Sequence, residues 1–481
     1  MKKVFKRGCA CIVILVAILL SLGIVAAVRV IGPLFSEGAN VLILFNNTDE
    51  MRGTGGFTTA YMTITRHKGD FVTHLGSSYE IDTPPSENGA VLVVPPPRPM
   101  HDYMGIDRWS FRDANWSPDY PTSAQAASQF YTQVTKAQTP LYVITVNMTA
   151  LRTLMLYLPP LKVACDVQGL ACQAPTVLLE NNILDWLRRG WNESASGAEG
   201  DKSFLGHKAH QMIKMIRALP FSDQWGAIPA VNEMLMRGDV MLYSSDPQIQ
   251  AFFAGRGWSG PFPLAAQGDV IVYSENNIGY NKTSSRLFRD FHYSVDFTQS
   301  PPIATLKMSY TLALRKGDAR DPSKERLDDP RLSECDTVDS VGALALGIPT
   351  YEDRMLGCAW IYGQIYPLPG SKLIDYDVPS IAADQFPFGL RGQTGRIDAL
   401  QAGSVKGWGY VMVIPYGETR TVTLTYTLLE TLSDTDYTIT LPAVAGMMGG
   451  WRVSIERKDG SFWQTFYNVW WRQFYGTWDR S

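Results

Sequence analysis

The sequence predicts an α/β protein with one N-terminal transmembrane helix, an α/β layered domain and a C-terminal antiparallel β-sandwich. Three observations predict this arrangement. A charge-free apolar run lies near the N-terminus, strand and helix patterns alternate up to residue 289, and only strand-length segments follow. Alternating strands and helices are typical of layered α/β domains, whereas many short strands are typical of sandwiches.

The apolar run covers residues 9–28 and follows four basic residues, Lys2, Lys3, Lys6 and Arg7. Twenty helical residues span about 30 Å, the thickness of a bilayer core. Because the basic residues come first, residues 1–8 are expected in the cytoplasm and the rest of the chain outside it, in a single-pass protein of the cell membrane. A cleaved secretory signal is the alternative, although the apolar region of a signal is shorter, about 7–15 residues.

The charge balance argues against nucleic-acid binding. The chain has 43 Lys+Arg against 46 Asp+Glu, so no basic excess is available for a phosphate backbone. Charged residues make up 19% and aromatic residues 11%, which favours a packed globular protein over a disordered one.

Four cysteines lie beyond the apolar run: Cys165, Cys172, Cys335 and Cys358. An even number in an exported chain predicts disulfides, and three pairings are possible. The short intervening segment favours Cys165–Cys172, which leaves Cys335–Cys358. Their uneven spacing argues against a zinc site.

The α/β domain is expected over residues 38–289. Its predicted strands are 41–45, 61–65, 141–146, 240–243 and 269–273. Its predicted helices begin near Pro121 and Thr149 and continue at 177–189, 203–219 and 227–237.

The β-sandwich is expected over residues 290–481, with a charged surface loop at 316–339. Its predicted strands are 291–297, 304–314, 359–368, 422–428, 437–441 and 451–456. Nine aromatic residues crowd positions 462–478, and one strand face cannot hide them all. Either core packing or contact with a partner would account for them.

Standard catalytic signatures are absent from the sequence: there is no Walker motif, nucleophile elbow, dinucleotide fingerprint or His-Glu-x-x-His motif. Gly53, Gly55 and Gly56 precede a strand and not a helix, so they indicate a tight turn and not a phosphate cradle. His207 and His210 lack a third ligand nearby in the sequence, which favours a surface or core pair.

Two polar segments are the candidate site. Residues 46–57 follow a predicted buried strand and include Arg52, and residues 111–121 precede a predicted helix and include Arg112. Ligands of α/β sheets bind at the carboxyl ends of strands, where both segments are expected. Arg52, Arg112 and also Arg66 could bind phosphate oxygens, and Asp113 and Asp119 could hold Mg²⁺. The alternative is a buried Arg–Asp network that ties two loops together.

The same two segments carry a resemblance to a known family. Asn46–Phe57 reads Asn-Asn-Thr-Asp-Glu-Met-Arg-Gly-Thr-Gly-Gly-Phe, and Arg112–Pro121 reads Arg-Asp-Ala-Asn-Trp-Ser-Pro-Asp-Tyr-Pro. Both resemble signature blocks of the uncharacterised bacterial and archaeal family called domain of unknown function 4012 (DUF4012). Further similarity lies at 258–260, 275–282 and 365–371. The acidic position of the first block is shifted or duplicated here, at Asp49 and Glu50.

More distantly, the layout resembles the LytR-CpsA-Psr glycopolymer transferases, which place arginines and aspartates around a Mg²⁺-bound polyprenyl pyrophosphate. This resemblance implies an LytR-CpsA-Psr-like α/β domain and catalytic roles for Arg52, Arg112 and Asp113. Ligand contacts would then come from Asn46, Asn47, Glu50, Arg66, Asn115 and Asp119. The chain departs from those enzymes at residues 58–60, where Thr-Thr-Ala replaces their Arg-Ser-Asp strand start.

Two functions remain open at this point. The first is a cell-envelope protein that binds an anionic, phosphorylated envelope glycan or lipid-linked ligand and transfers a glycopolymer with the help of Mg²⁺. The second is a non-catalytic surface or assembly component that binds partner proteins through its β-sandwich and aromatic C-terminus.

Overall fold

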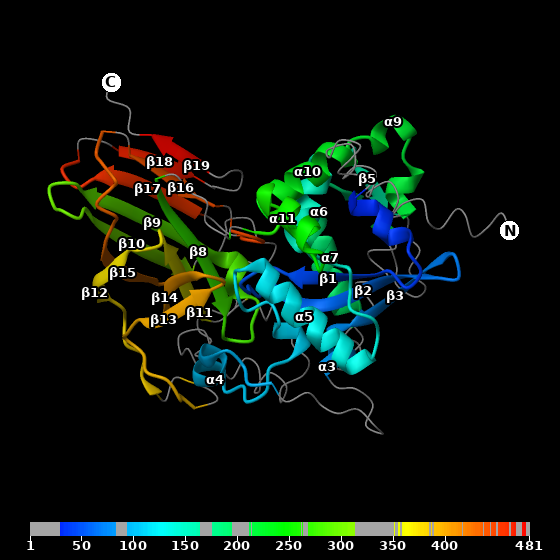
Figure 1. Ribbon diagram of the computed structural model, residues 1–481, viewed down its shortest axis with the longest axis horizontal. Helices are drawn as coiled ribbons and strands as arrows, with labels where there is room; N and C mark the ends of the chain where they lie inside the picture. Colours follow the sequence, from blue (N-terminus) through cyan, green and yellow to red (C-terminus); the bar gives the residue numbers. More distant parts are fainter. Residues whose placement is uncertain are drawn as a thin grey trace. The chain divides into compact units, whose positions relative to one another are not determined.

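The chain forms two compact units, each assembled from separate stretches of sequence (Figure 1). The computed structural model describes residues 29–82, 94–163, 176–194, 211–212, 214–260, 262, 268–312, 351, 355, 358–383, 386, 389–415, 417–435, 437–442, 444–448, 451–460, 463–467 and 474–477. Unit 1 comprises Met1–Asn47, Thr58–Leu92 and Ala124–Ser259, and unit 2 comprises Thr48–Phe57, Val93–Ser123 and Gly260–Ser481. The chain therefore passes between the units five times, whereas the sequence suggested one boundary after residue 289.

Unit 1 is built on a five-stranded sheet in the order β3-β2-β1-β4-β7. Strands β1 (Asn40–Asn47) and β4 (Tyr142–Asn147) are parallel, and β7 (Val240–Ser244) runs antiparallel to β4. At the other end, β2 (Phe57–His67) pairs with β3 (Asp70–Ser77) in an antiparallel hairpin. The apolar run after Asn40 forms β1. No residue of this strand is exposed, as expected for an inner strand of the sheet.

Helices accompany this sheet in unit 1. Their bounds are η1 Gly32–Phe35, α3 Ser78–Asp82, α5 Tyr120–Thr135, α6 Met148–Met155, α7 Ile183–Ser194, α9 Phe221–Gln224, α10 Ala227–Arg237 and α11 Pro247–Gly255. A two-stranded sheet is formed by β5 (Leu161–Val163) and β6 (Thr176–Leu178). Side chains of β1, α10 and α11 share one core, which includes Val41, Leu235 and Phe253. The first four residues of α5 belong to unit 2.

Unit 2 contains two six-stranded sheets, in the orders β12-β15-β10-β9-β17-β18 and β13-β14-β11-β8-β16-β19. The strands of the first sheet are β9 Leu287–Asp296, β10 Ile303–Leu312, β12 Lys372–Asp377, β15 Thr419–Thr427, β17 Trp451–Arg457 and β18 Trp463–Tyr467. Those of the second are β8 Asp269–Asn277, β11 Ala359–Pro367, β13 Asp398–Ala402, β14 Val405–Ile414, β16 Thr438–Leu441 and β19 Phe474–Thr477.

The two sheets form a sandwich because side chains of both meet in one core. Leu306, Met308 and Tyr310 point inward from β10 and meet Ile361 of β11 and Met412 of β14. The intervening β10 residues are more exposed, which is the alternation that a half-buried strand requires. The sandwich is antiparallel except where β8 pairs with β16 and β9 with β17, which are parallel.

Some predicted elements differ from the observed ones. The helix expected over 177–189 is a short strand, β6, followed by α7 from Ile183, and most of the helix expected over 203–219 lies outside the described residues. Strands β3, β12, β13 and β14 were not anticipated. Glycines interrupt β14, and β3 and β12 are largely exposed, so none shows a clear apolar alternation.

The expected membrane helix requires a correction. Residues 9–28 lie outside the described residues, and no helix in the part of the chain that the structure describes is long and apolar enough to cross a bilayer. Even α5, with 16 residues, would span only about 24 Å. The predicted transmembrane segment, and with it the single-pass topology and cell-membrane location, is therefore not supported.

The expected disulfides also require a correction. Cys358 is the only cysteine among the described residues, and it is disulfide-bonded. No disulfide pair is found within those residues, since Cys165, Cys172 and Cys335 lie outside them. The pairings Cys165–Cys172 and Cys335–Cys358 are therefore not supported. The loop expected at 316–339 also lies outside the described residues.

Candidate functional site

The loop Thr48–Phe57 leaves the unit 1 sheet after β1 and belongs to unit 2, where it lies against the end of β8. The backbone N–H of Asn277, the last residue of β8, donates to the carbonyl of Met51 at 2.9 Å. Within the loop, the N–H groups of Gly55 and Phe57 donate to the carbonyls of Arg52 and Glu50, both at 2.8 Å. The glycine-rich segment is therefore a closed turn whose backbone is fixed to the sandwich.

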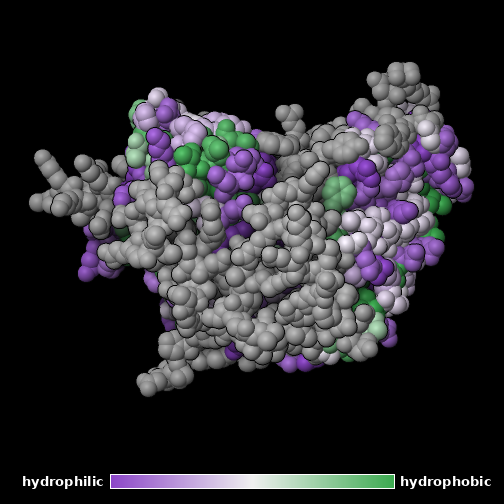
Figure 2. Space-filling model, turned by 180° about the vertical axis from the view of Figure 1, so that it is seen from behind, coloured by the Kyte–Doolittle hydropathy of each residue, from purple (hydrophilic) through white to green (hydrophobic). Residues whose placement is uncertain are grey.

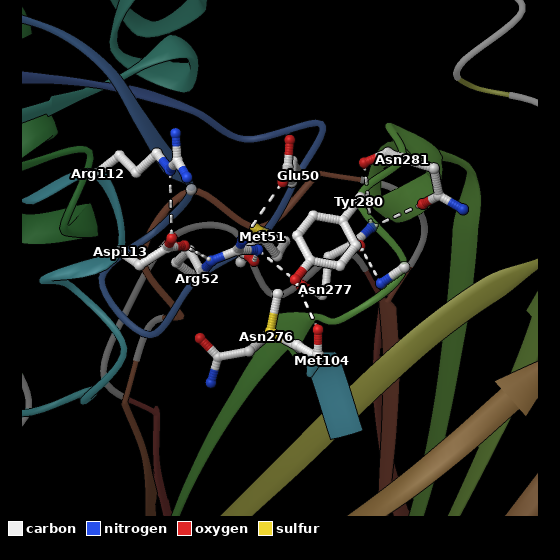
Figure 3. Close-up of polar contacts among 12 residues, drawn as sticks. Glu50, Met51, Arg52, Met104, Arg112, Asp113, Asn276, Asn277, Tyr280 and Asn281 are labelled. Atoms are coloured by element: carbon white, nitrogen blue, oxygen red, sulfur yellow. Dashed lines mark hydrogen bonds and ion pairs between the residues drawn. The ribbon is translucent and has the colours of Figure 1, made fainter. Parts of the chain in front are cut away.

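Arg52 lies at the centre of this loop and is only 1% exposed. Its Nε donates to Asp113 Oδ1 at 3.0 Å, and its Nη2 donates to Glu50 Oε1 at 3.3 Å. Its Nη1 donates to the carbonyls of Met51 and Asn277, at 3.0 and 2.7 Å (Figure 3). Burial opposes the charge, but the carboxylates of Asp113 and Glu50 outweigh it and raise the pKa of Arg52. Arg52 is therefore charged, and each of its three guanidinium nitrogens donates a hydrogen bond.

Glu50 joins a second cation to the network. Its Oε2 pairs with the ammonium group of Lys282, which is also buried. The ring of Phe57 lies near both cations, with its centroid 5.3 Å from Arg52 Cζ and 5.6 Å from Lys282 Nζ. The positive charges of Arg52 and Lys282 thus offset the negative charges of Glu50 and Asp113 inside unit 2.

Asp113 is positioned by the short helix η2 (Phe111–Asp113) and is 3% exposed. Besides Arg52, it faces Arg112, whose Nε lies 3.7 Å from Asp113 Oδ2. The side chain of Arg112 is 32% exposed, which makes it the most accessible charge of this group. Burial and then Asp113 raise the pKa of the nearby Tyr280, whose hydroxyl donates to the Met104 carbonyl.

Asparagine side chains fix the two loops to β8 and to each other. Asn276 Oδ1 accepts from the N–H of Gly53 at 2.9 Å, and Asn276 Nδ2 donates to the Trp116 carbonyl at 3.4 Å. Asn115 Nδ2 donates to the Gly56 carbonyl at 2.6 Å. A Cβ at Gly53 would lie 2.3 Å from the Trp116 carbonyl oxygen, so only glycine permits this approach of the two loops.

A second buried ion pair joins β8 to β9. Glu275, one residue before Asn276, pairs with Arg289, and both side chains are 0% exposed. Arg289 Nη1 also donates to the carbonyls of Leu287 and Met448, at 2.7 and 3.1 Å. The end of β8 therefore carries polar contacts on both of its faces.

The other predicted site residues make contacts of their own. Asn46 lies in unit 1, where its Oδ1 accepts from Thr58, and Asn47 ends β1 of that unit. Arg66 also lies in unit 1, with its Cζ 4.9 Å from the ring centroid of Phe71. Asp119 accepts from the N–H of Thr122 at 3.1 Å in the first turn of α5.

The metal site predicted for Asp113 and Asp119 stays a prediction, and both carboxylates already accept hydrogen bonds from the protein. Asp113 is occupied by Arg52, and Asp119 is occupied by Thr122. In the described part of the chain, no group of three or more His, Cys, Asp or Glu side chains could hold a metal ion.

Sequence reasoning missed several residues of the network. Glu275, Asn276, Asn277 and Lys282 were noted only as a stretch of family resemblance, with no role. Tyr351, whose hydroxyl donates to Asp49 at 2.7 Å, was not noted at all. One signal in the sequence could have pointed to the β8 residues. The polar run 274–277 directly follows an apolar strand at Val270–Tyr273.

Comparison with known proteins supports the family resemblance over part of the chain. Residues 37–189 match the family described as protein of unknown function, DUF4012. This stretch contains both loops of the network but not β8. No curated protein matches the chain.

Solved structures show only weak similarity. The Lin1025 protein of Listeria innocua is 11% identical, with a TM-score of 0.26 over 47% of this chain and 80% of its own. A transcriptional regulator of Enterococcus faecalis is 14% identical, with a TM-score of 0.26 over 46% of this chain and 72% of its own. Similarity this low establishes neither a shared fold nor a shared activity.

Proposed function

We propose that this chain is a non-catalytic binding or assembly component, in which the two signature loops hold the fold and the β-sandwich binds a partner protein. The observation that carries the proposal is the burial of Arg52, which is 1% exposed and donates to two carboxylates and two carbonyls. A phosphate ligand would have to remove Arg52 from Asp113 and Glu50. That exchange would take from the buried Asp113 carboxylate the cation that lies closest to it, which is costly.

A partner surface is available at an edge of the sandwich. Among the described residues, strand β12 is the first strand of its sheet and pairs with β15 alone, so no other described strand pairs with its outer backbone groups. Its side chains Ile374 and Tyr376 are 52% and 43% exposed. On the face of the molecule that Figure 2 shows, hydrophobic residues form small separate areas among hydrophilic residues and grey atoms. An exposed edge strand fits strand addition by a partner, which supplies affinity through backbone hydrogen bonds.

A photo-crosslinking experiment tests this function. A photoreactive residue replaces Ile374 in the full chain, expressed in its native host. Lys307, an exposed residue of strand β10 in the same sheet, is the matched control position. We expect one discrete protein adduct from position 374 and none from position 307. Equal labelling at both positions, or no protein adduct at either, would contradict a partner surface at β12.

A second candidate function rests on Arg112. Its side chain is 32% exposed beside the buried network, so it could meet an anionic, phosphorylated ligand without disrupting Arg52. Glycopolymer transfer would further require a free carboxylate as base, and Asp113 is engaged by Arg52.

Direct binding separates the two candidates. Purified full-length protein is titrated with a polyprenyl pyrophosphate and Mg²⁺, in parallel with Arg112→Gln. Saturable binding that Arg112→Gln abolishes would favour the ligand-binding function. No binding by the parent protein favours the non-catalytic one.

A further inference from the structure

A carboxyl group is buried in the core of the β-sandwich, away from the Arg52 network. Asp269 is the first residue of β8 and is 0% exposed. Its Oδ2 accepts from the hydroxyls of Tyr293 and Tyr437, both at 2.5 Å. Its Oδ1 accepts from the backbone N–H of Val270 at 2.7 Å. Tyr293 lies on β9 of the opposite sheet, so this carboxyl group links the two sheets of the sandwich.

The backbone holds Asp269 in this position. Gly268 has a φ of +97°, which favours glycine, and a Cβ there would lie 1.9 Å from Thr438 Oγ1. The register of the parallel pair places Ile439 of β16 beside Asp269. The backbone at Gly268 and Asp269 therefore lies directly against Thr438 and Ile439.

The titratable groups that the structure describes around Asp269 are tyrosine hydroxyls. Its titratable neighbours are Tyr293 from β9, Tyr426 from β15 and Tyr437 from the residue before β16, and burial raises the pKa of all three hydroxyls. In the described part of unit 2, no Lys, Arg or His forms an ion pair with Asp269. Glu275, six residues along the same strand, has Arg289. Asp269 is thus a buried acid that no described cation neutralises.

We propose that Asp269 takes up a proton when the sandwich folds and thereby makes the stability of the sandwich depend on pH. The two tyrosine hydroxyls and the Val270 N–H favour the ionised form, whereas burial favours the neutral form. Burial dominates, and the pKa of Asp269 is raised above its ordinary value. A protonated Oδ2 would donate to one tyrosine, which would turn its hydroxyl to accept.

The sign of the effect follows from the direction of this shift. Because the folded state binds the proton more tightly than the unfolded state, the contribution of Asp269 is fully present below the ordinary aspartate pKa of about 3.9. It is lost as the pH rises through the pKa of Asp269 in the folded state. In that interval one proton is released on unfolding, so the unfolding equilibrium constant rises up to about tenfold per pH unit.

Urea unfolding of the full chain across pH tests the proposal, with Asp269→Asn as the variant and Asp375→Asn, on the exposed strand β12, as the control. We expect the ratio of unfolding constants, wild type over Asp269→Asn, to rise by up to about tenfold per pH unit above pH ~4. For Asp375→Asn the same ratio should not show this rise. Parallel curves for wild type and Asp269→Asn would overturn the proposal.

A second variant keeps the proposal testable if Asp269→Asn does not fold. Tyr437→Phe removes one hydroxyl that favours the ionised carboxylate, so it should extend the pH-dependent interval to higher pH. In both proteins, the infrared band of a protonated carboxyl should persist above the pH at which exposed carboxyls ionise. The proposal would be overturned if the wild type lacked that infrared band. It would also be overturned if Tyr437→Phe left the pH-dependent interval of stability unchanged.

Discussion

Arg52 and Asp113, 61 positions apart in the chain, form a buried ion pair with their Nε and Oδ1 atoms 3.0 Å apart. The pair joins the two most recognisable segments of the sequence inside one unit. Glu50 and Lys282 complete its charge balance, so the network behaves as one structural element. Three predictions test this network and the contacts around it, and a fourth tests the carboxylate of Asp296 in the sandwich.

Arg52→Ala should lower the free energy of unfolding by about 3–5 kcal/mol, because it removes the buried cation closest to the Asp113 carboxylate and leaves only the partly exposed Arg112 beside it. Arg112→Ala removes the neighbouring but partly exposed cation and should cost only about 0–1 kcal/mol. Urea unfolding monitored by tryptophan fluorescence compares the two. Equal losses would show that Arg52 does not hold the loops together.

Removing both members of the pair should cost less than the sum of the two single changes. In Arg52→Met with Asp113→Leu, Glu50 still pairs with Lys282, and the one charge that loses a partner is the partly exposed Arg112. A double-mutant cycle should therefore give a coupling energy of about 0.5–3 kcal/mol. Additive effects would indicate that Arg52 and Asp113 act independently.

Gly53→Ala should destabilise unit 2, because its Cβ would lie 2.3 Å from the Trp116 carbonyl oxygen. We expect a loss of about 1–3 kcal/mol, as for other overpacked sites. Gly255→Ala is the control, since that glycine lies in α11 with nothing within 4 Å of the added carbon. Thermal unfolding should show a lower midpoint for Gly53→Ala alone.

Asp296 should produce an acid-side loss of stability, opposite in sign to Asp269. Its hydrogen bond from Lys458, followed by those from Thr298, lowers its pKa to about 2. Its contribution is therefore present above the ordinary aspartate pKa and is lost as the pH falls toward about 2. Unfolding measured between pH 2 and pH 5 should show a shallower acid-side decline for Asp296→Asn than for wild type. A decline of equal slope in both proteins would contradict this assignment.

Much of the architecture was predictable because local patterns encode it. The buried run after Asn40 and the helix 227–237 follow directly from apolar periodicity. The meeting of the two polar segments was also foreseen, in the form of a buried Arg–Asp network weighed against a ligand site. Arg52 and Asp113 match that alternative.

The rest depended on contacts between distant positions. Asn276 and Lys282 complete the network from more than 220 positions away, and no local pattern connects them with Glu50 or Gly53. Arg66 was grouped with Arg52 by residue type alone, yet it stacks on Phe71 in the other unit. Residue type can identify candidate residues in the sequence, but the fold determines which of them are in contact.

The five passages of the chain between the two units also limit how such a protein can change over generations. A gene segment encoding residues 260–481 would carry Glu275, Asn276 and Lys282 but lack Arg52, Glu50 and Asp113. Recombination at that boundary would separate Lys282 from Glu50, its ion-pair partner. Neither unit can therefore be exchanged with another protein as a single cassette, and the two must be inherited together.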